Sequence, residues 1–512
     1  MTLQEKIGQR LMTGFPGVEM SEEFRRAVRE HKIGNVILFK ENIADCAQLK
    51  QLCADIQDFV RQETGHSAFI AVDQEGGIVT RLKEDGVNIP GAMALGATGD
   101  PENAYKAAKL IGEELRALGP NFNFAPTVDV NCNPKNPVIG VRSYGDDPHS
   151  VARFGVRAAQ GFMDGGTLCC VKHFPGHGDT DQDSHLSLPC VDKSMEQLEQ
   201  MELIPFRAAV EAGVPAVMTS HILFPQIEPE NVPATMSRRI MTDLLREKMG
   251  FRGIIVSDGM EMAAIKANYG VCQGTLAAFR AGVDLVEITH GTLVACEAAQ
   301  LILEEAQNGG LDLEELDASV QRILDAKEKW IEKALPCDFD FAAAAEESRK
   351  LLEKTVTQIA PRPVDFQFSE NPLCIGCEAY RTSLVGNVDE EKGNPFGLAA
   401  AQALHGTCAD MTRDPSPEEI EELVARAKIH GSAVVGTYNS VANPGQMALI
   451  RALAEAGIPT VVAGLRAPYD LLGLPEGIWA FVVYENSRMS IQAAVKVLTG
   501  ELIPTGKLPV KL

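Results

Sequence analysis

The chain has 512 residues, of which 45% are hydrophobic and 23% are charged. This composition excludes a disordered chain, a fibrous repeat and a small disulfide scaffold, and the length predicts two or three domains. Lys and Arg number 47 against 70 Asp and Glu, a net charge of −23. We expect neither nucleic acid nor an anionic membrane surface as a partner, because this charge repels both.

The first residues predict where the protein resides. Charged side chains stand where a signal peptide needs an apolar core, and no later run reaches the roughly 18 apolar residues of a membrane span. We therefore expect a cytoplasmic protein, unless a leader segment has been removed. The 12 cysteines are scattered among apolar neighbours, which is typical of reduced, buried thiols. Even the pair Cys374 and Cys377 is interpreted as two buried thiols at a strand end, not as a zinc site.

Short β-branched runs alternate with helical stretches from residue 1 to about residue 335, and repeated strand-helix units predict a parallel sheet. The runs lie at 35–39, 68–73, 123–129, 169–173, 216–221, 254–258 and 284–288, and the helical stretches include 46–63, 101–118, 193–212 and 291–308. Five of the seven runs end in Asp, His or Lys-His, where a (β/α) barrel places its reacting groups. No Gly-rich dinucleotide fingerprint follows the first strands. We predict a (β/α)8-like TIM barrel, with the eighth strand unplaced.

A second α/β unit follows the barrel. A long amphipathic helix is predicted over 312–334, and a connecting helix and linker after it. Alternation then resumes, with strands predicted at 382–385, 433–437, 459–465 and 479–484 and helices at 416–429, 444–456 and 489–498. We therefore divide the chain into a barrel domain (1–335), a linker (336–364) and a smaller α/β sandwich domain (365–512).

The densest polar cluster runs from Lys172 to His185 and reads Lys-His-Phe-Pro-Gly-His-Gly-Asp-Thr-Asp-Gln-Asp-Ser-His. Its proline and glycines exclude a helix, so the segment is predicted to be a strand end followed by a loop. Asp183 stands two residues before His185, close enough in a loop to hydrogen-bond the ring and raise its basicity. That pair suits a general acid/base, although an isolated triplet of this kind is more often a solvated turn.

Asp258 ends an apolar strand, and it is the second candidate. A carboxylate at a barrel strand end can act as a nucleophile toward a sugar carbon. The alternative is an N-cap for the next helix, and residue chemistry alone leaves the two interpretations about even. Asp73 also ends a strand, and Arg81 and Arg142 lie on loops predicted at the same face. With Lys172 and His173, these groups suit a ligand rich in hydroxyls and carbonyls, although each alone is more often part of a surface ion pair.

The motifs together resemble those of the NagZ-type β-N-acetylhexosaminidases of glycoside hydrolase family 3. The resemblance rests on Lys172-His-Phe-Pro-Gly-His-Gly-Asp-Thr180 with Asp183-Ser-His185, and it continues through Val72-Asp-Gln-Glu-Gly-Gly77, Arg142-Ser-Tyr-Gly145 and Ser257-Asp258. It covers essentially the whole first domain. The second domain resembles the α/β sandwich of the two-domain members.

The resemblance implies a retaining exo-glycosidase that removes terminal β-linked N-acetylglucosamine, typically from peptidoglycan fragments during cell-wall recycling. It implies that Asp258 is the nucleophile and that His185, paired with Asp183, is the acid/base. It also implies that the sugar is held by Asp73, Arg81, Arg142, Lys172 and His173. A carbohydrate is then the partner, and neither a metal nor an organic cofactor is implied.

Three alternatives remain open at this point. A neutral His in place of a second carboxylate lets phosphate approach the anomeric carbon, which would give a phosphorylase in place of a hydrolase. A metal-dependent hydrolase could use His173, His177, His185 and Asp183 as ligands. A sugar-binding protein without turnover is the third, although it would have no need of Asp183, His185 and Asp258 together. The sequence leaves the aglycone and the oligomeric state undetermined.

Overall fold

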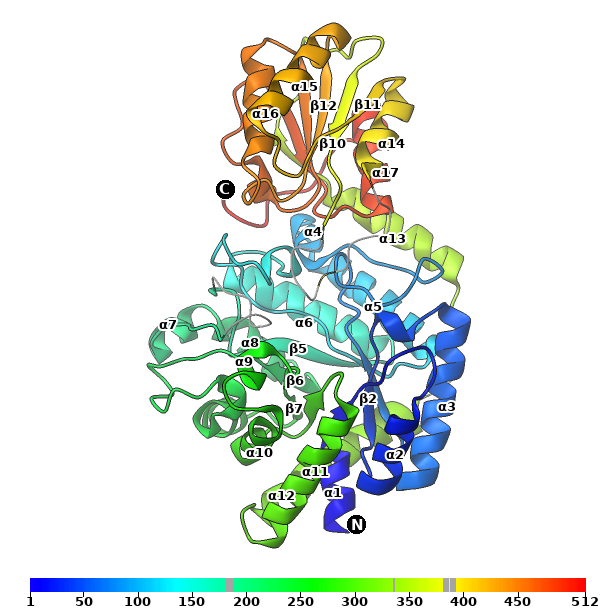
Figure 1. The fold of residues 1–512 in the computed structure, drawn as a ribbon, viewed down its shortest axis with the longest axis vertical. Helices are drawn as coiled ribbons and strands as arrows, with labels where there is room; N and C mark the ends of the chain where they lie inside the picture. The colour runs from blue at the N-terminus through cyan, green and yellow to red at the C-terminus, as the bar shows by residue number, and fades with distance from the viewer. Residues whose placement is uncertain (181–187, 335–336, 381–385, 387–392) are drawn as a thin grey trace.

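Eight parallel strands form a barrel in the first part of the chain (Figure 1). The computed structural model describes residues 1–512 except 181–187, 335–336, 381–385 and 387–392. The barrel strands follow the spatial order β7-β6-β5-β4-β3-β2-β1-β8, and a bridge between Val256 and Leu285 joins the two ends. Their bounds are β1 Leu11–Thr13, β2 Asn35–Ile37, β3 Phe69–Val72, β4 Phe122–Asn123, β5 Leu168–Phe174, β6 Ala216–Thr219, β7 Ile254–Val256 and β8 Val286–Ile288.

The predicted barrel is confirmed, and β1 is the strand that the sequence left unplaced. It is three residues long and directly follows a helix, so it offers no alternation for a pattern to detect. The barrel's α-helices are α1 Leu3–Gln9, α2 Glu22–His31, α3 Cys46–Thr64, α4 Ala92–Ala97, α5 Pro101–Leu118, α6 Pro148–Asp164, α7 Met195–Gln200, α8 Leu203–Glu211, α9 Ala263–Lys266, α10 Val271–Ala281, α11 Thr292–Gln307 and α12 Leu313–Lys327.

Local sequence signals set the ends of several of these helices. Asp45 and Asp100 accept hydrogen bonds from the first-turn N–H groups of α3 and α5, and Gly65 and Gly119 end the same helices with φ of +78° and +111°. The helix expected over 193–212 is two helices, because the chain breaks at Met201 before α8 begins. The helix expected over 312–334 is α12, which continues as a π-helix over Glu328–Glu332.

The barrel interior has an apolar layer beneath a polar one. Alternate strand residues face inward, and Ala71, Cys170, Val256 and Leu285 belong to the apolar cluster inside the barrel. The inward-facing positions two residues further along line the cavity above this cluster. They are Lys172 in β5 and Glu287 in β8, together with Asp73 and Asp258 just after the ends of β3 and β7. Apolar side chains thus fill the barrel interior, and ionisable groups follow them at the carboxyl ends of the strands, as expected of an active-site face.

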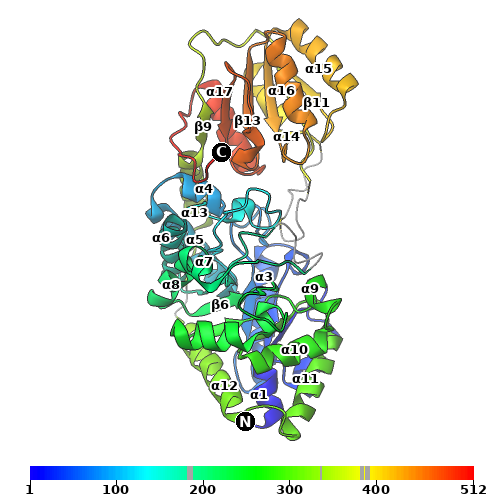
Figure 2. The ribbon, with the colours of Figure 1, turned by 90° about the vertical axis from the view of Figure 1, so that its left-hand side faces the viewer.

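The second unit is a six-stranded sheet with helices on both faces (Figure 2). Its strand order is β11-β10-β12-β13-β14-β9, and only β9 is antiparallel to its neighbour. The strands are β9 Thr357–Ala360, β10 Leu373–Gly376, β11 Thr407–Asp410, β12 Ala433–Thr437, β13 Thr460–Gly464 and β14 Trp479–Val482. Helices α15 (Pro417–His430) and α16 (Gly445–Glu455) pack on one another, as do α14 (Pro395–Leu404) and α17 (Arg488–Thr499).

The α/β sandwich is therefore confirmed, and the strand predictions at 433–437, 459–465 and 479–484 correspond to β12, β13 and β14. The strand predicted at 382–385 lies outside the described residues. The range expected as a linker contains helix α13 (Phe341–Thr355) and then β9, which pairs with β14 at the sheet edge. Cys374 lies in β10 and Cys377 just after it, both buried; burial raises their pKa values to about 12 and about 11, so both remain thiols.

The two units share a hydrophobic core. Met93, Ala94 and Ala97, all on α4 of the barrel, belong to the apolar cluster of the second unit. The C-terminal segment returns to the barrel, where the Lys507 N–H donates to the Ala97 carbonyl at 2.7 Å. Across the same boundary, the amide of Asn131 donates to the Tyr469 hydroxyl at 3.0 Å. No helix among the described residues is long and apolar enough to cross a membrane.

Candidate active site

A cavity of about 700 Å³ lies at the carboxyl ends of the barrel strands, a volume suited to a small ligand. Its wall contains all six predicted site residues that the structure describes, namely Asp73, Arg81, Arg142, Lys172, His173 and Asp258. The predicted acid/base pair, Asp183 and His185, lies outside the described residues. The structure therefore brings together groups that are up to 185 positions apart in the sequence.

Lys172 is the centre of a buried ion network in this wall. Its Nζ lies 2.8 Å from Asp73 Oδ1 and 2.7 Å from Glu75 Oε1, and the lysine side chain is 2% exposed. Glu75 also accepts from Arg142, whose NH2 group lies 2.7 Å from Oε1 and whose Nε lies 3.0 Å from Oε2. The pairing fixes all four side chains in position before any ligand binds.

The network keeps its members ionised in spite of burial. Burial disfavours the carboxylates, but Lys172 and Arg81 together outweigh it and hold the pKa of Asp73 below its usual value. Burial opposes the charge of Glu75 in the same way, and Arg142 with Lys172 holds its pKa far below the usual range. Burial also disfavours the ammonium, yet Asp73 and Glu75 raise the pKa of Lys172. The wall thus presents fixed charges to a ligand.

Arg81 reaches the cavity from the loop after β3, and Gln74 shapes that loop. The Gln74 side-chain oxygen accepts the backbone N–H of Arg81 at 2.7 Å, and its amide donates to the Thr80 hydroxyl at 2.7 Å. Gln74 is itself held by two hydrogen bonds of 2.9 Å with the side chain of Asn123 on β4. Arg81 can then place its NH2 group 3.3 Å from Asp73 Oδ2.

His173 follows Lys172 directly, and both side chains line the cavity because the register of β5 against β6 shifts between Val171 and Phe174. The His173 Nδ1–H donates to Asp129 Oδ2 at 2.7 Å, and its other ring nitrogen faces Arg142 NH2 at 3.4 Å. Asp129 also accepts the backbone N–H groups of His173 and His177. Asp129 therefore fixes both the position and the tautomer of His173.

Asp258 stands just after β7 on a short turn into the cavity. Its Oδ1 accepts the backbone N–H of Gly259 at 2.8 Å. The next helix, α9, begins at Ala263 with Met262 as its N-cap, so Asp258 is not a helix cap. His221, completely buried behind the turn, donates its Nε2–H to the Gly259 carbonyl at 3.0 Å. His221 is thus a core residue that supports the turn carrying Asp258.

The described histidines that a metal site would use, His173 and His177, already make hydrogen bonds within the protein. The ring nitrogens of His173 pair with Asp129 and Arg142, and Nδ1 of His177 lies 2.9 Å from the Thr180 hydroxyl. Burial and the neighbouring His173 lower the pKa of His177 to about 4, so its ring is neutral. A metal ion at this position would have to compete with these hydrogen bonds for the histidine nitrogens.

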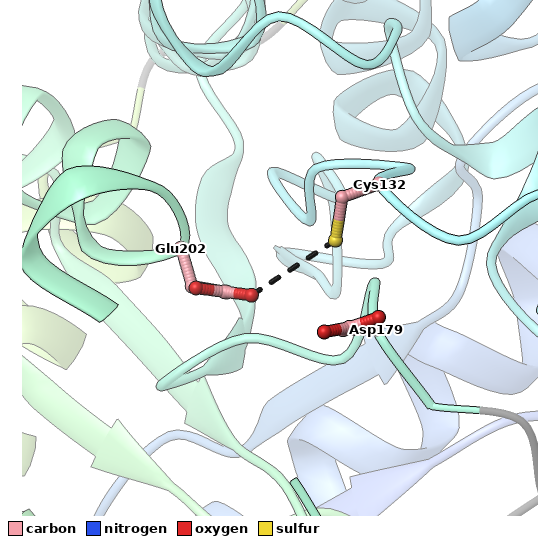
Figure 3. A group of neighbouring side chains, drawn as sticks. All are labelled: Cys132, Asp179 and Glu202. Atoms are coloured by element: carbon pink, nitrogen blue, oxygen red, sulfur yellow. Dashed lines mark hydrogen bonds between the residues drawn. The ribbon is translucent and has the colours of Figure 1, made fainter. Parts of the chain in front are cut away.

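Among the described residues, another group has donor atoms spaced for a cation: Cys132, Asp179 and Glu202 (Figure 3). The position between the two carboxylates is taken by the Lys193 ammonium, 2.6 Å from Asp179 Oδ2 and 2.5 Å from Glu202 Oε1. Burial raises the pKa of the Cys132 thiol to about 12, so it is not a thiolate at neutral pH. Asp179 and Glu202 therefore form an ion network in which the Lys193 ammonium is the cation.

Sequence reasoning missed three of the buried groups. Glu75 lies two residues after Asp73 in a motif that was noted, and Asp129 ends a predicted strand, so the signal for both was position alone. Glu287 lies inside the predicted strand 284–288, and its inward phase would have identified it. His290, which had no distinguishing context, lies at the cavity wall with its ring centroid 4.5 Å from that of Phe39.

Comparisons with known proteins agree with this architecture. A solved structure of a glycoside hydrolase family 3 beta-N-acetylglucosaminidase from Paenibacillus sp. str. FPU-7 superposes with a TM-score of 0.93 at 39% identity, covering 100% of this chain and 99% of that chain. A beta-hexosaminidase from Xylella fastidiosa (strain M23) is 37% identical over 290 residues, 56% of this chain and 84% of the relative.

Beta-hexosaminidase A of Pseudoalteromonas piscicida is 36% identical over 367 residues, 64% of this chain, and the match spans 61% of that relative's length. The model of the glycosyl hydrolase family 3 N terminal domain matches residues 2–326, which include all eight barrel strands and every described residue that lines the cavity. The chain therefore belongs to glycosyl hydrolase family 3.

Proposed function

We propose that this protein is a retaining exo-β-N-acetylglucosaminidase. The observation that supports it best is the cavity itself, where Asp258 shares the wall with Asp73, Lys172 and Arg142. These three belong to a preformed ion network that Glu75 completes from behind the wall. An accessible carboxylate beside fixed hydrogen-bonding groups suits attack on a bound sugar. The Paenibacillus relative named a beta-N-acetylglucosaminidase, which aligns over the whole chain, supports the same activity.

The proposed reaction proceeds in two displacements. In the first, an oxygen of Asp258 forms a bond to the anomeric carbon while the bond to the leaving oxygen breaks and His185 delivers its proton to that oxygen. In the second, water attacks the anomeric carbon, His185 takes the water proton, and the ester bond to Asp258 breaks. Asp183 hydrogen-bonds the His185 ring and stabilises its charged form. The sugar leaves with its original anomeric configuration.

The buried network holds the sugar in this scheme. Asp73 accepts from ring hydroxyls, and Lys172, Arg81 and Arg142 donate to hydroxyl and acetamido oxygens. The Nε2 atom of His173 acts as an acceptor, because its Nδ1–H already donates to Asp129. Because protein contacts already fix these side chains, binding costs little further conformational entropy. We further propose that the substrates are GlcNAc-terminated fragments of peptidoglycan, processed in the cytoplasm during cell-wall recycling. No described part of the site depends on a metal or an organic cofactor in this scheme.

Release of nitrophenol tests the proposal. We expect wild-type protein to cleave nitrophenyl β-N-acetylglucosaminide far faster than the β-glucoside, and Asp258→Ala and His185→Ala to lose turnover. Asp243→Ala and His149→Ala, which change an exposed Asp and an exposed His on outer helices, serve as matched controls and should keep it. Formation of a sugar 1-phosphate when phosphate is added would instead identify a phosphorylase. No turnover of either glycoside would favour a sugar-binding protein.

A further inference from the structure

Glu287 is a carboxyl group in the cavity wall with no role in the scheme above. It belongs to β8 and is 3% exposed. Leu285, two residues earlier in the same phase, lies in the apolar interior of the barrel, so the side chain of Glu287 faces the same axis one layer higher. It lines the same cavity as Asp258.

Ion pairs or hydrogen bonds within the protein stabilise the charges of two other carboxylates around this cavity, Asp73 and Glu261. Lys172 and Arg81 pair with Asp73, and the backbone N–H groups of His290 and Gly291 donate to Glu261. By contrast, no side-chain hydrogen bond or ion pair joins the Glu287 carboxyl to any residue within the described part of the chain. Burial, together with the nearby charges of Asp73, Asp258 and Glu261, raises the pKa of Glu287 well above its usual value, although Lys172 opposes this.

The backbone of Glu287 is tied to both sides of Asp258. Its N–H donates to the Ser257 hydroxyl at 2.8 Å, and its carbonyl accepts the Met260 N–H at 2.9 Å. Ser257 and Met260 flank Asp258 and Gly259 in the sequence, so the turn that presents Asp258 and the strand that presents Glu287 form one rigid unit. A sugar whose anomeric carbon reaches Asp258 therefore also comes against Glu287.

We propose that Glu287 is a further substrate-binding residue, which hydrogen-bonds a ring hydroxyl of the sugar held at Asp258. This inference rests on the proposed function and adds a specificity contact to it. A buried carboxyl without a partner carries a desolvation cost that a ligand can relieve. A hydroxyl suits it best, because it both accepts from and donates to a protonated carboxyl. An ammonium group would require Glu287 to ionise beside Asp73 and Asp258.

Two variants separate a ligand contact from a structural role. Glu287→Gln keeps a donor and an acceptor in the same volume, whereas Glu287→Leu keeps only the volume. We expect Glu287→Gln to stay within about threefold of wild type in kcat/KM, and Glu287→Leu to fall roughly tenfold or more, mainly through KM. Glu297→Leu, at an exposed position on α11, controls for the replacement of a glutamate by leucine away from the cavity. The thermal midpoint of Glu287→Leu should equal or exceed that of wild type, because an unpaired buried carboxyl is removed.

The decisive measurement pairs these variants with the 3-deoxy, 4-deoxy and 6-deoxy analogues of nitrophenyl β-N-acetylglucosaminide. For the analogue that lacks the partner hydroxyl, we expect wild type and Glu287→Leu to have equal kcat/KM. If Glu287→Leu loses the same factor of kcat/KM on every analogue, or loses nothing on the parent sugar, the inference is overturned. The proposed function stays intact in both cases as long as the wild-type protein turns over the parent sugar. Selective loss of activity on the β-glucosaminide would also overturn it, in favour of a contact with an ammonium group. Wild-type protein inactive on the N-acetylglucosaminide would remove the proposed function and this inference with it.

Discussion

Asp258→Ala is expected to lower kcat on nitrophenyl β-N-acetylglucosaminide by roughly 10⁴-fold or more, because the reaction loses the atom that bonds to the anomeric carbon. The fold should be unaffected, because Asp258 lies after the end of β7 in the cavity wall and not in the apolar core. The variant also leaves space for a small anion. Added azide should restore part of the turnover and yield a glycosyl azide of inverted anomeric configuration.

The azide product distinguishes a nucleophile from a merely electrostatic carboxylate. Attack by azide from the side of Asp258 inverts the anomeric centre once, whereas the wild-type enzyme inverts it twice. Asp243→Ala, with its exposed side chain on the outer helix Arg239–Lys248, should show neither the loss nor the rescue. Turnover of Asp258→Ala within tenfold of wild type would contradict the assignment of Asp258.

Lys172→Met is expected to lower the free energy of unfolding by about 3–5 kcal/mol and to abolish most activity. The methionine fills a similar volume but leaves Asp73 without its nearest cation and Glu75 with Arg142 alone. Chemical denaturation followed by circular dichroism measures the change. Lys248→Met, which breaks the exposed pair with Glu199, is the matched control and should cost about 0–1 kcal/mol.

The decrease in the free energy of unfolding caused by Lys172→Met should also depend on pH. Lys172 holds the pKa of both Asp73 and Glu75 below the unfolded-state values, so its stabilisation is complete above those values and is lost as the pH falls through the folded-state values. In Lys172→Met the two carboxyls protonate more easily. The difference in unfolding free energy between wild type and variant should therefore be largest near neutral pH and narrow as the pH falls below about 4, the unfolded-state value of these carboxyls. A difference independent of pH would show that Lys172 acts by packing and not by charge.

Patterns local in the sequence predicted most of the fold. Runs that alternate with amphipathic stretches located seven barrel strands, since each run spans enough residues to show its period. Strands with a short apolar run escaped: β1 has only two apolar residues, Leu11 and Met12, and β11 (Thr407–Asp410) carries polar residues at both ends of an edge strand. Strand β9 was placed in a linker because the strand that it pairs with, β14, lies more than 100 positions later in the sequence.

The sequence predicted which residues would lie at the cavity where a residue's own position carried the signal. Asp73, Lys172 and Asp258 each end or follow an apolar strand, and parallel strands in a barrel bring such ends together. Glu75 and Asp129 escaped because their importance lies in partners distant in sequence, Arg142 and His173. Glu287 lies within the predicted strand 284–288, and unlike Asp73 and Asp258 it does not stand at the end of its strand.

The central claim is that the reaction passes through a covalent ester between the sugar and Asp258. A slow N-acetylglucosaminyl substrate, fluorinated on the ring and at the anomeric carbon, should trap that ester. Mass spectrometry of the treated protein and its peptides measures it directly. We predict a mass gain of one fluorinated sugar, located on the peptide that contains Asp258 and absent in Asp258→Ala. Turnover without any adduct, or an adduct on another residue, would contradict the account.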